Sequence, residues 1–265
     1  MGIVMDIKIP KTTIRYTAET MAELTSLGLW DDSDLIREKM KTLQFTEKWE
    51  EVPVKTIGMW MSGGADSSMC AYLLNKKIRD ENLDVKFQPM SVRRGRGWNP
   101  VYAGTVIDFI ENALNIKMND HIIYYPDIND YYQREIKEFR DRDVENFNNG
   151  TFQIMYSGIS CNPPKSEVSQ STEEERDEDN DRPVETRSGF AHYINPFFDM
   201  NKRDIAKLYD EHDLTHTMFP LTRSCEGSDY ESGNYTWHCG KCWWCEERMW
   251  AFGFLDKPTQ QFIYD

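Results

Sequence analysis

The sequence lacks any long apolar run. No stretch of about 18 apolar residues occurs, which is the length that a membrane-spanning helix needs. The N-terminal segment MGIVMDIKIPK also lacks the apolar core of a secretory signal peptide. We therefore expect a soluble, cytoplasmic protein with no membrane partner.

The sequence is also poor in positive charge. Its 31 lysines and arginines are outnumbered by 45 aspartates and glutamates, which gives a formal net charge of −14. Nucleic-acid binders usually carry a basic face that neutralises phosphates. The charge balance therefore argues against a nucleic-acid partner and favours chemistry on a small molecule.

The order of the apolar segments predicts the fold class. Short apolar runs predict strands at 56–61, 85–92, 121–125, 152–159 and 191–198. Helical periodicity follows or separates them at 69–78, 99–115, 129–147 and 201–214. Alternation of this kind predicts an α/β fold with a doubly wound, Rossmann-like parallel sheet, helices on both faces, and ligands at the carboxyl ends of the strands.

Composition divides the chain into an N-terminal extension, an α/β domain and a small C-terminal lobe, at residues 1–52, 53–222 and 223–265. In the extension, helical spacing predicts helices at 18–27 and 33–49. Within the α/β domain, residues 163–188 are strongly acidic and nearly free of apolar side chains, so they have little surface to bury. We expect a disordered surface insertion there, and an acidic lid or partner-binding segment is the alternative.

A glycine-rich turn, Ser-Gly-Gly-Ala-Asp-Ser-Ser at 62–68, follows the first strand of the α/β domain. Adjacent glycines let the backbone approach a phosphate, and the next helix directs its positive end toward the anion. The turn is not a Walker A motif, because no Gly-Lys-Ser/Thr ends it, and it is not GxGxxG. A plain strand-to-helix turn capped by Asp66 and Ser67 is the alternative. The candidate phosphate-binding residues are Ser62, Gly63, Gly64, Ala65, Asp66, Ser67 and Ser68.

Four of the six cysteines cluster near the C-terminus. Cys239, Cys242 and Cys245 are separated by two residues each, and Cys225 lies a short loop upstream. Two-residue gaps let thiolates converge on one tetrahedral ion, and four thiolates leave no coordination position open. We predict a structural zinc site. His238 is an alternative ligand, and reduced cysteines that merely pack are the alternative without a metal.

Basic side chains near the predicted strand ends are further candidates. Arg93, Arg94 and Arg96 follow the second strand, where a guanidinium could bind a phosphate or a substrate carboxylate; a solvated basic loop is the alternative. Lys202 begins a helix for which Asn201 is the expected N-cap. It could reach nucleotide phosphates, or it could be an ordinary surface lysine.

Two of these motifs resemble those of a known family. The turn is similar to the SGGxDS signature of the PP-loop ATP pyrophosphatases, in which the loop holds the pyrophosphate of ATP. Ser224-Cys225 and the segment CGKCWWCEERMWAF resemble the SC, CGxCxxCxxR and AF pattern of the 7-cyano-7-deazaguanine synthase family. The resemblance covers about residues 54–254. It implies an adenine nucleotide alpha hydrolase-like fold with ATP, Mg²⁺ and Zn²⁺ as cofactors.

The same resemblance implies an ATP-dependent carbon-nitrogen ligase of queuosine biosynthesis. A carboxylate of a deazapurine substrate attacks the α-phosphorus of ATP, pyrophosphate leaves, and ammonia displaces AMP; a second activation turns the amide into a nitrile. A homodimer is compatible with the sequence. The implied catalytic residues are Ser62, Asp66, Ser67 and Lys202, with Arg93 joining the turn in cofactor binding and Cys225, Cys239, Cys242 and Cys245 as metal ligands.

Two segments depart from the family pattern. The family shows a YGQxH-like stretch where this chain has residues 91–98, and a YPDC-type motif where it has 159–164. Because those segments are expected to shape the substrate pocket, two other functions stay open. One is a relative that adenylates a tRNA base or another acid, and the other is a zinc-knuckle binding module without turnover.

Overall fold

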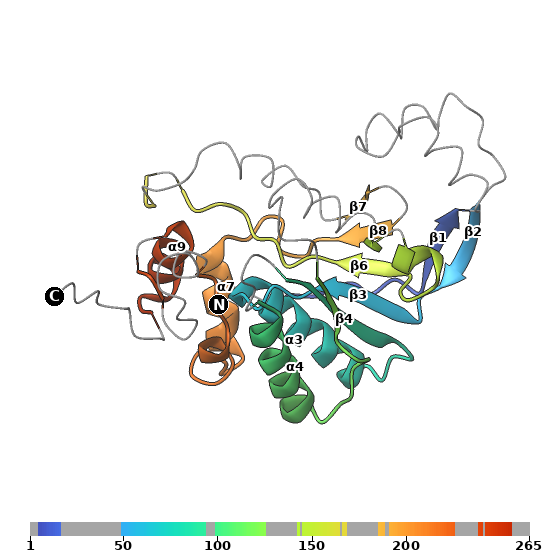
Figure 1. The fold of residues 1–265 in the computed structure, drawn as a ribbon, viewed down its shortest axis with the longest axis horizontal. Helices are drawn as coiled ribbons and strands as arrows, with labels where there is room; N and C mark the ends of the chain where they lie inside the picture. The colour runs from blue at the N-terminus through green and yellow to red at the C-terminus, as the bar shows by residue number, and fades with distance from the viewer. Residues whose placement is uncertain are drawn as a thin grey trace.

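The computed structural model describes residues 5–16, 49–93, 99–125, 142–143, 145–164, 166–168, 185–188, 191–225, 238–240 and 242–255. These residues form a six-stranded sheet, a separate two-stranded sheet, and helices that pack around the larger one (Figure 1).

The larger sheet has the strand order β5-β4-β3-β6-β8-β7, in which β7 pairs antiparallel and the other five strands are parallel. The predicted Rossmann-like parallel sheet is therefore confirmed. In chain order the elements are β3 (Thr56–Trp60), α3 (Ala65–Asp80), β4 (Lys86–Val92), α4 (Asn99–Leu114), β5 (Ile122–Tyr124), β6 (Ile154–Tyr156), β7 (Glu185–Ser188), β8 (Ala191–Ile194), α7 (Lys202–Glu211), the 3-10 helix η1 (Phe219–Leu221) and α9 (Trp243–Phe252).

The helices determine where a ligand can bind. Helices α3 and α4 cover one face of the sheet, whereas α7 and α9 lie beyond the carboxyl ends of β6 and β8 (Figure 1). Strand β3 is central, and the turn that leaves it runs directly into α3. The glycine turn therefore lies at the carboxyl edge of the parallel sheet, where open α/β sheets bind their ligands.

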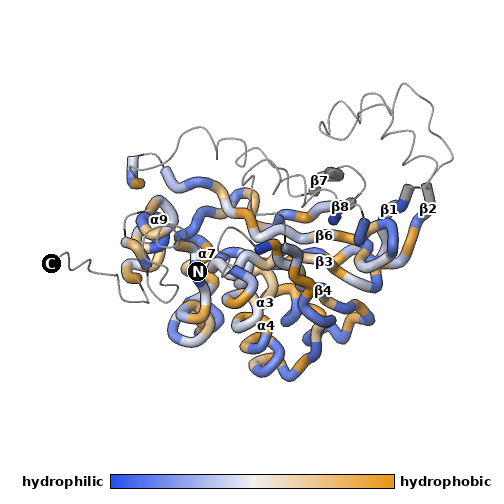
Figure 2. The backbone as a smooth tube through the Cα atoms, viewed as in Figure 1, coloured by the Kyte–Doolittle hydropathy of each residue, from blue (hydrophilic) through white to orange (hydrophobic). Residues whose placement is uncertain are grey.

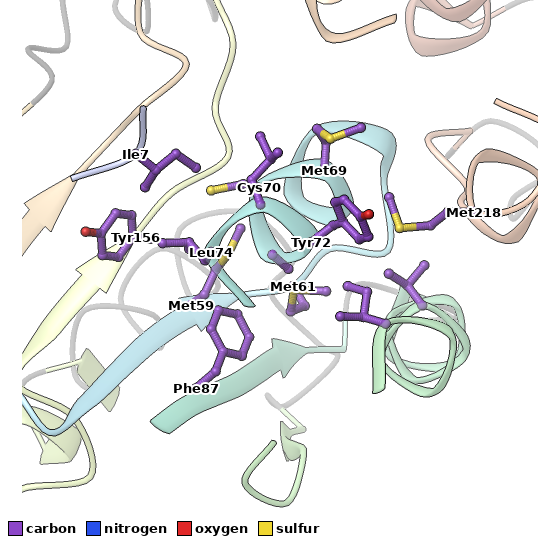
Figure 3. Packing of buried hydrophobic residues seen from close by; sticks show 14 of the residues in the cluster. Ile7, Met59, Met61, Met69, Cys70, Tyr72, Leu74, Phe87, Tyr156 and Met218 are labelled. Carbon is purple, nitrogen blue, oxygen red and sulfur yellow. The ribbon is translucent and has the colours of Figure 1, made fainter. Parts of the chain in front are cut away.

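The core between the sheet and α3 is built from side chains that alternate between the two faces of each strand. Ile57 and Met59 of β3 are fully buried, and Figure 3 shows Met59 beside Leu74 of α3. Figure 2 shows the apolar residues along β4, and a mixture of apolar and hydrophilic residues along α4, one side of which faces solvent. Burial of these apolar surfaces holds α3, and with it the glycine turn, against the sheet.

The opposite face carries a polar cluster around the buried Asp143. Trp60 Nε1 donates a hydrogen bond of 2.8 Å to Asp143 Oδ1, and the Tyr193 hydroxyl donates to Asp143 Oδ2. Asp143 lies in the C-terminal part of the helix predicted at 129–147; residues 142–143 and 145–148 are helical, and 126–141 lie outside the described residues. Burial raises the pKa of Asp143 to about 7, although both hydrogen bonds act in the opposite direction.

The N-terminal part differs from the prediction. β1 (Thr12–Tyr16) and β2 (Trp49–Pro53) form an antiparallel pair, with Thr12 opposite Pro53 and Tyr16 opposite Trp49. A helical extension over 1–52 is therefore wrong at these two ends, and Trp49, the last residue of the helix predicted at 33–49, lies in a strand. Residues 17–48, which include both predicted helices up to that point, lie outside the described residues.

The acidic insertion is also more structured at its ends than predicted. Val168 is buried, and Glu167 accepts hydrogen bonds from Trp250 and Arg203. At the other end, β7 adds an antiparallel strand to the sheet edge next to β8. Loop composition cannot reveal the contacts of Glu167, because Arg203 and Trp250 come from distant parts of the chain. Residues 169–184 lie outside the described residues.

Among the described residues, no helix has both the length and the apolarity that crossing a bilayer requires.

The buried carboxyl group predicts a pH dependence of stability. Because the folded-state pKa of Asp143 is about 7 and lies above its usual value of 3.8, its stabilising contribution is present at low pH and is lost as the pH rises through 7. We expect the free energy of unfolding of Asp143→Asn to fall less between pH 5 and pH 8 than that of the wild type, by about 2 kcal/mol. Urea unfolding at a series of pH values measures this, and equal pH slopes for the two proteins would contradict it.

Candidate nucleotide and metal sites

The exit from β3 is fixed by hydrogen bonds to β4. The Met61 amide donates to the Met90 carbonyl at 2.6 Å, and the Ser91 hydroxyl donates to the Met61 carbonyl at 2.6 Å. His121 Nε2 lies 2.8 Å from the same hydroxyl, and burial lowers the pKa of His121 to about 4. Since the Ser91 proton is used by Met61, a neutral His121 donates to Ser91. The residue before the turn is thereby held at both its backbone groups.

Gly63 is required by the backbone of the turn. Its backbone φ angle is +76°, a conformation that residues other than glycine rarely adopt. A Cβ atom there would lie 2.7 Å from Tyr102 Cβ and 2.9 Å from the Asn99 carbonyl oxygen, both at the start of α4. The turn can approach α4 this closely only with glycine at position 63.

The hydroxyls of the turn have different surroundings. The exposed Ser62 Oγ accepts from the Gly64 amide at 3.2 Å and lies 3.0 Å from Ser67 Oγ. Ser68 is fully buried, and its hydroxyl donates to the Gly64 carbonyl at 2.7 Å. Gly64 is the N-cap of α3 and offers no side-chain cap to the first amides. These amides and Ser62 can therefore bind an anion, whereas Ser68 stabilises the turn.

Asp66 of the turn forms an ion pair with Lys202 at the start of α7. Lys202 Nζ pairs with Asp66 Oδ2 and lies 3.4 Å from Glu247 Oε2, and the Ser160 hydroxyl lies 3.4 Å from the same Asp66 oxygen. Lys202 and Glu247 are buried. Asp66 Oδ1 is buried and has no hydrogen-bond partner among the described residues. An unpaired carboxylate oxygen in this position has the chemistry of a ligand for a hard cation.

Gly158, just after β6, lies directly against the turn. A Cβ atom at this position would lie 2.7 Å from Ser67 Cα and 2.9 Å from the Ser67 amide nitrogen. Both contacts are to backbone atoms, which cannot rotate away. Sequence reasoning missed Gly158, because only the packing of β6 against α3 reveals its role.

The four predicted metal ligands converge. The Sγ atoms of Cys225, Cys239, Cys242 and Cys245 all lie within 4.8 Å of one another, and two of the pairs lie 3.9 Å apart. Thiolates at about 2.3 Å from one tetrahedral zinc ion lie about 3.8 Å apart. A [4Fe-4S] cluster binds its four thiolates through four separate irons, which sets the sulfurs farther apart. The geometry therefore fits a single tetrahedral ion.

Hydrogen bonding among the thiols favours one thiolate and disfavours others. Bonds from Cys239, Cys242 and Cys245 lower the pKa of Cys225. The pKa values of Cys242 and Cys245 are raised, in both cases mainly by their hydrogen bonds with Cys225. Four thiolates at such short separations would need a compensating cation. His238 is fully buried with Nδ1 3.9 Å from Cys245 Sγ, and the converging donor set comprises the four sulfurs.

The cysteine lobe is attached to the glycine turn through the backbone. The Arg223 amide donates to the Gly63 carbonyl at 2.7 Å, and Arg223 Nε donates to the Cys225 carbonyl at 3.1 Å. From α7, the Tyr209 hydroxyl donates to the Ala65 carbonyl at 2.9 Å. The residue two positions before the first metal ligand therefore contacts the turn directly.

The structure thus brings most predicted site residues into two adjoining groups. The turn residues and Lys202 form one group, and the four cysteines form the other. Arg93 lies at the end of β4, where its amide donates to the Tyr124 carbonyl, and Arg94 and Arg96 lie outside the described residues. Sequence reasoning missed Glu247, which has no motif signal.

The C-terminal part of the chain is similar to a known protein family. Residues 187–255 match the family model described as Queuosine biosynthesis protein QueC. The U34-tRNA thiolase NcsA from Methanococcus maripaludis with its [4Fe-4S] cluster is 16% identical, covering 75% of this chain and 70% of that chain with a TM-score of 0.41. NAD+ synthetase from Burkholderia pseudomallei is 14% identical, covering 93% and 84% with a TM-score of 0.39. No curated protein matches the chain.

The family match confirms the predicted resemblance to the PP-loop ATP pyrophosphatases, with the 7-cyano-7-deazaguanine synthase family as the similar branch. The matched segment contains Lys202 and all four clustered cysteines, whereas the glycine turn precedes this segment. Together with the turn, the match supports an ATP-using, adenylating enzyme.

Gly158 offers a test of the turn that changes no polar group. We expect Gly158→Ala to force the start of α3 away from β6, to lower the free energy of unfolding by about 1–3 kcal/mol, and to weaken nucleotide binding. Gly104→Ala is the matched control, because nothing lies within 4 Å of a Cβ there; it should stabilise α4 by about 0.5–1 kcal/mol. Chemical unfolding and calorimetric titration with MgATP measure both effects. A Gly158→Ala protein as stable as the control would be incompatible with this packing.

The cysteine group predicts one tetrahedral metal ion per chain. We expect the purified protein to contain one equivalent of zinc, and cobalt substitution to give the absorption of a four-thiolate site. Cys242→Ser should lose the metal and lower the thermal unfolding midpoint, because the binding free energy of the metal then no longer stabilises the folded lobe. Cys70→Ser is the control, since Cys70 is buried in α3 away from the group and should leave metal content unchanged. An iron-sulfur chromophore would instead refute the single-ion geometry.

Proposed function

We propose that this protein is an ATP-dependent carbon-nitrogen ligase that adenylates a carboxylate and adds ammonia, with 7-carboxy-7-deazaguanine as the substrate and 7-cyano-7-deazaguanine as the product. The observation that carries the proposal is the joining of an SGGxDS-type turn to a four-cysteine lobe through Arg223 and Lys202. The family match on the same lobe favours this branch over other adenylating enzymes.

The turn provides the groups that ATP cleavage between the α and β phosphates needs. The uncapped first amides of α3 and the exposed Ser62 hydroxyl would bind the departing pyrophosphate. When Mg²⁺ is bound it neutralises phosphate charge, and Asp66 Oδ1 is the oxygen best placed among the turn residues to hold it. Ser67 would assist Ser62, to which it lies at hydrogen-bond distance.

Catalysis in this proposal is positioning and charge stabilisation. The substrate carboxylate oxygen attacks the α-phosphorus, the bond to the pyrophosphate breaks, and an acyl-adenylate forms. Ammonia then attacks the acyl carbon, AMP leaves, and the amide results; a second ATP activates the amide oxygen, and loss of AMP gives the nitrile. No protein nucleophile is required.

The cysteine group would have a structural role. Four thiolates would occupy all four coordination positions of a tetrahedral ion, so no position would stay open for a substrate. The ion would be held by Cys225, Cys239, Cys242 and Cys245, and would fix the start of α9 and the segment that carries Arg223.

Product analysis tests the proposal. With 7-carboxy-7-deazaguanine, ammonia and MgATP, we expect mass spectrometry to detect the amide and the nitrile, with release of AMP and pyrophosphate. Asp66→Asn should lower turnover at least about 100-fold, because it removes the carboxylate charge that would hold the Mg²⁺ neutralising the phosphates in the transition state. Pyrophosphate release only with tRNA would favour the rival that adenylates a tRNA base, and no release with any acceptor would refute the ligase.

A further inference from the structure

Three charged side chains, two of them buried, connect the glycine turn to the cysteine lobe. Lys202 Nζ pairs with Asp66 Oδ2 and lies 3.4 Å from Glu247 Oε2. The side chains of Lys202 and Glu247 are 5% and 0% exposed. Buried charges interact more strongly than surface charges, because little water screens them. A change in one member must therefore affect the other two.

Glu247 reaches this cluster from the metal-binding end of the molecule. It lies on α9, whose N-cap is Cys242 and whose first turn contains Cys245. Glu247 follows Cys245 by two residues, so whatever fixes the start of α9 also fixes this carboxylate. Helix α7, which begins at Lys202, packs directly on α9.

The three side chains carry two negative charges and one positive charge. Asp66 and Glu247 contribute two carboxylates, and Lys202 contributes one ammonium. Lys202 and Ser160 approach Asp66 through Oδ2, while Oδ1 has no hydrogen-bond partner among the described residues. A cation close to Oδ1 would balance the charges of these three side chains.

We propose that Glu247 is a positioning residue for nucleotide binding. By sharing the Lys202 ammonium with Asp66, it keeps Asp66 from being fully neutralised and holds both side chains in place, which leaves Oδ1 for the cation that accompanies ATP. The proposal rests on the ATP site proposed above. If Glu247 loses its charge, Lys202 neutralises Asp66 alone, and the attraction for the cation weakens.

Glu167 provides a matched control. Its Oε2 accepts hydrogen bonds from Arg203 of α7 at 2.6 Å and from Trp250 of α9 at 2.9 Å, so it also bridges these two helices. Unlike Glu247 it is exposed, and its partners are not those of the turn. Glu167→Gln therefore removes a charged bridge between α7 and α9 without touching Lys202 or Asp66.

Calorimetric titration of zinc-loaded proteins with Mg²⁺ and α,β-methylene-ATP tests the proposal. We expect Glu247→Gln to raise the Kd about tenfold, Glu247→Asp to give an intermediate value because it keeps the charge on a shorter side chain, and Glu167→Gln to stay within about twofold. Zinc content and circular dichroism should be unchanged. Wild-type affinity in a folded Glu247→Gln protein would overturn the proposal.

Hydrogen exchange without nucleotide separates this inference from the proposed function. In the peptide covering residues 62–69, we expect exchange in zinc-loaded Glu247→Gln to be at least about threefold faster than in the wild type and in Glu167→Gln. If exchange changes as expected but the wild type binds no nucleotide, the proposed function fails and the positioning of the turn by Glu247 stands. Unchanged exchange overturns the inference whatever the nucleotide does. If Glu247→Gln loses its fold, the same comparison with Glu247→Asp decides.

Discussion

Close backbone packing around the glycine turn is the constraint on which the rest of the structure depends. The start of α4 lies against Gly63, the chain after β6 lies against Ser67 at Gly158, and the Arg223 amide donates to the Gly63 carbonyl. These contacts come from three separate parts of the chain. Because they involve backbone atoms, small side-chain movements cannot relieve a misfit. The turn therefore has one conformation only when all three neighbours are in place.

This packing gives the C-terminal lobe a role in the first half of the chain. A structural metal usually stabilises the residues nearest to it. Here the segment that leads to Cys225 is also one wall of the turn, and the helix that follows Cys242 and Cys245 supplies Glu247 to the charge cluster under it. Arg248 adds a third connection, since its buried guanidinium donates to the Phe219 carbonyl and to Thr222. The lobe and the turn are therefore parts of one assembly.

Much of this could be predicted from the sequence, for physical reasons that differ between elements. The parallel strands were predictable because buried strands appear as short apolar runs, such as that of β3 with the fully buried Ile57 and Met59. Helices α3, α4 and α7 were predictable because their buried side gives helical apolar periodicity. The cysteine group was predictable because tetrahedral coordination imposes a spacing. The β1–β2 pair was not, since its partners are separated by residues 17–48 and neither strand has a distinctive pattern.

The charge cluster was predictable only in part. The start of α7 carries a clear signal, and Asn201 caps it with a capping box that involves Asp204. That geometry places Lys202 in the first turn of the helix, but it does not say whether the side chain faces solvent or core. The answer depends on Asp66 and Glu247, which are distant in sequence, and on α9, whose periodicity is weak.

The balance of charge argues for the kind of ligand that the site can accept. A free polyphosphate would bring several negative charges next to Asp66, whose carboxylate is only partly compensated by Lys202. Amides at the start of α3 attract an anion, but they carry only partial charges. A nucleotide complexed with a divalent cation would satisfy both requirements, because the α3 amides could hold its phosphates and Asp66 Oδ1 could hold its cation. This balance of charge supports the proposed binding of a metal-bound nucleotide over that of a bare anion.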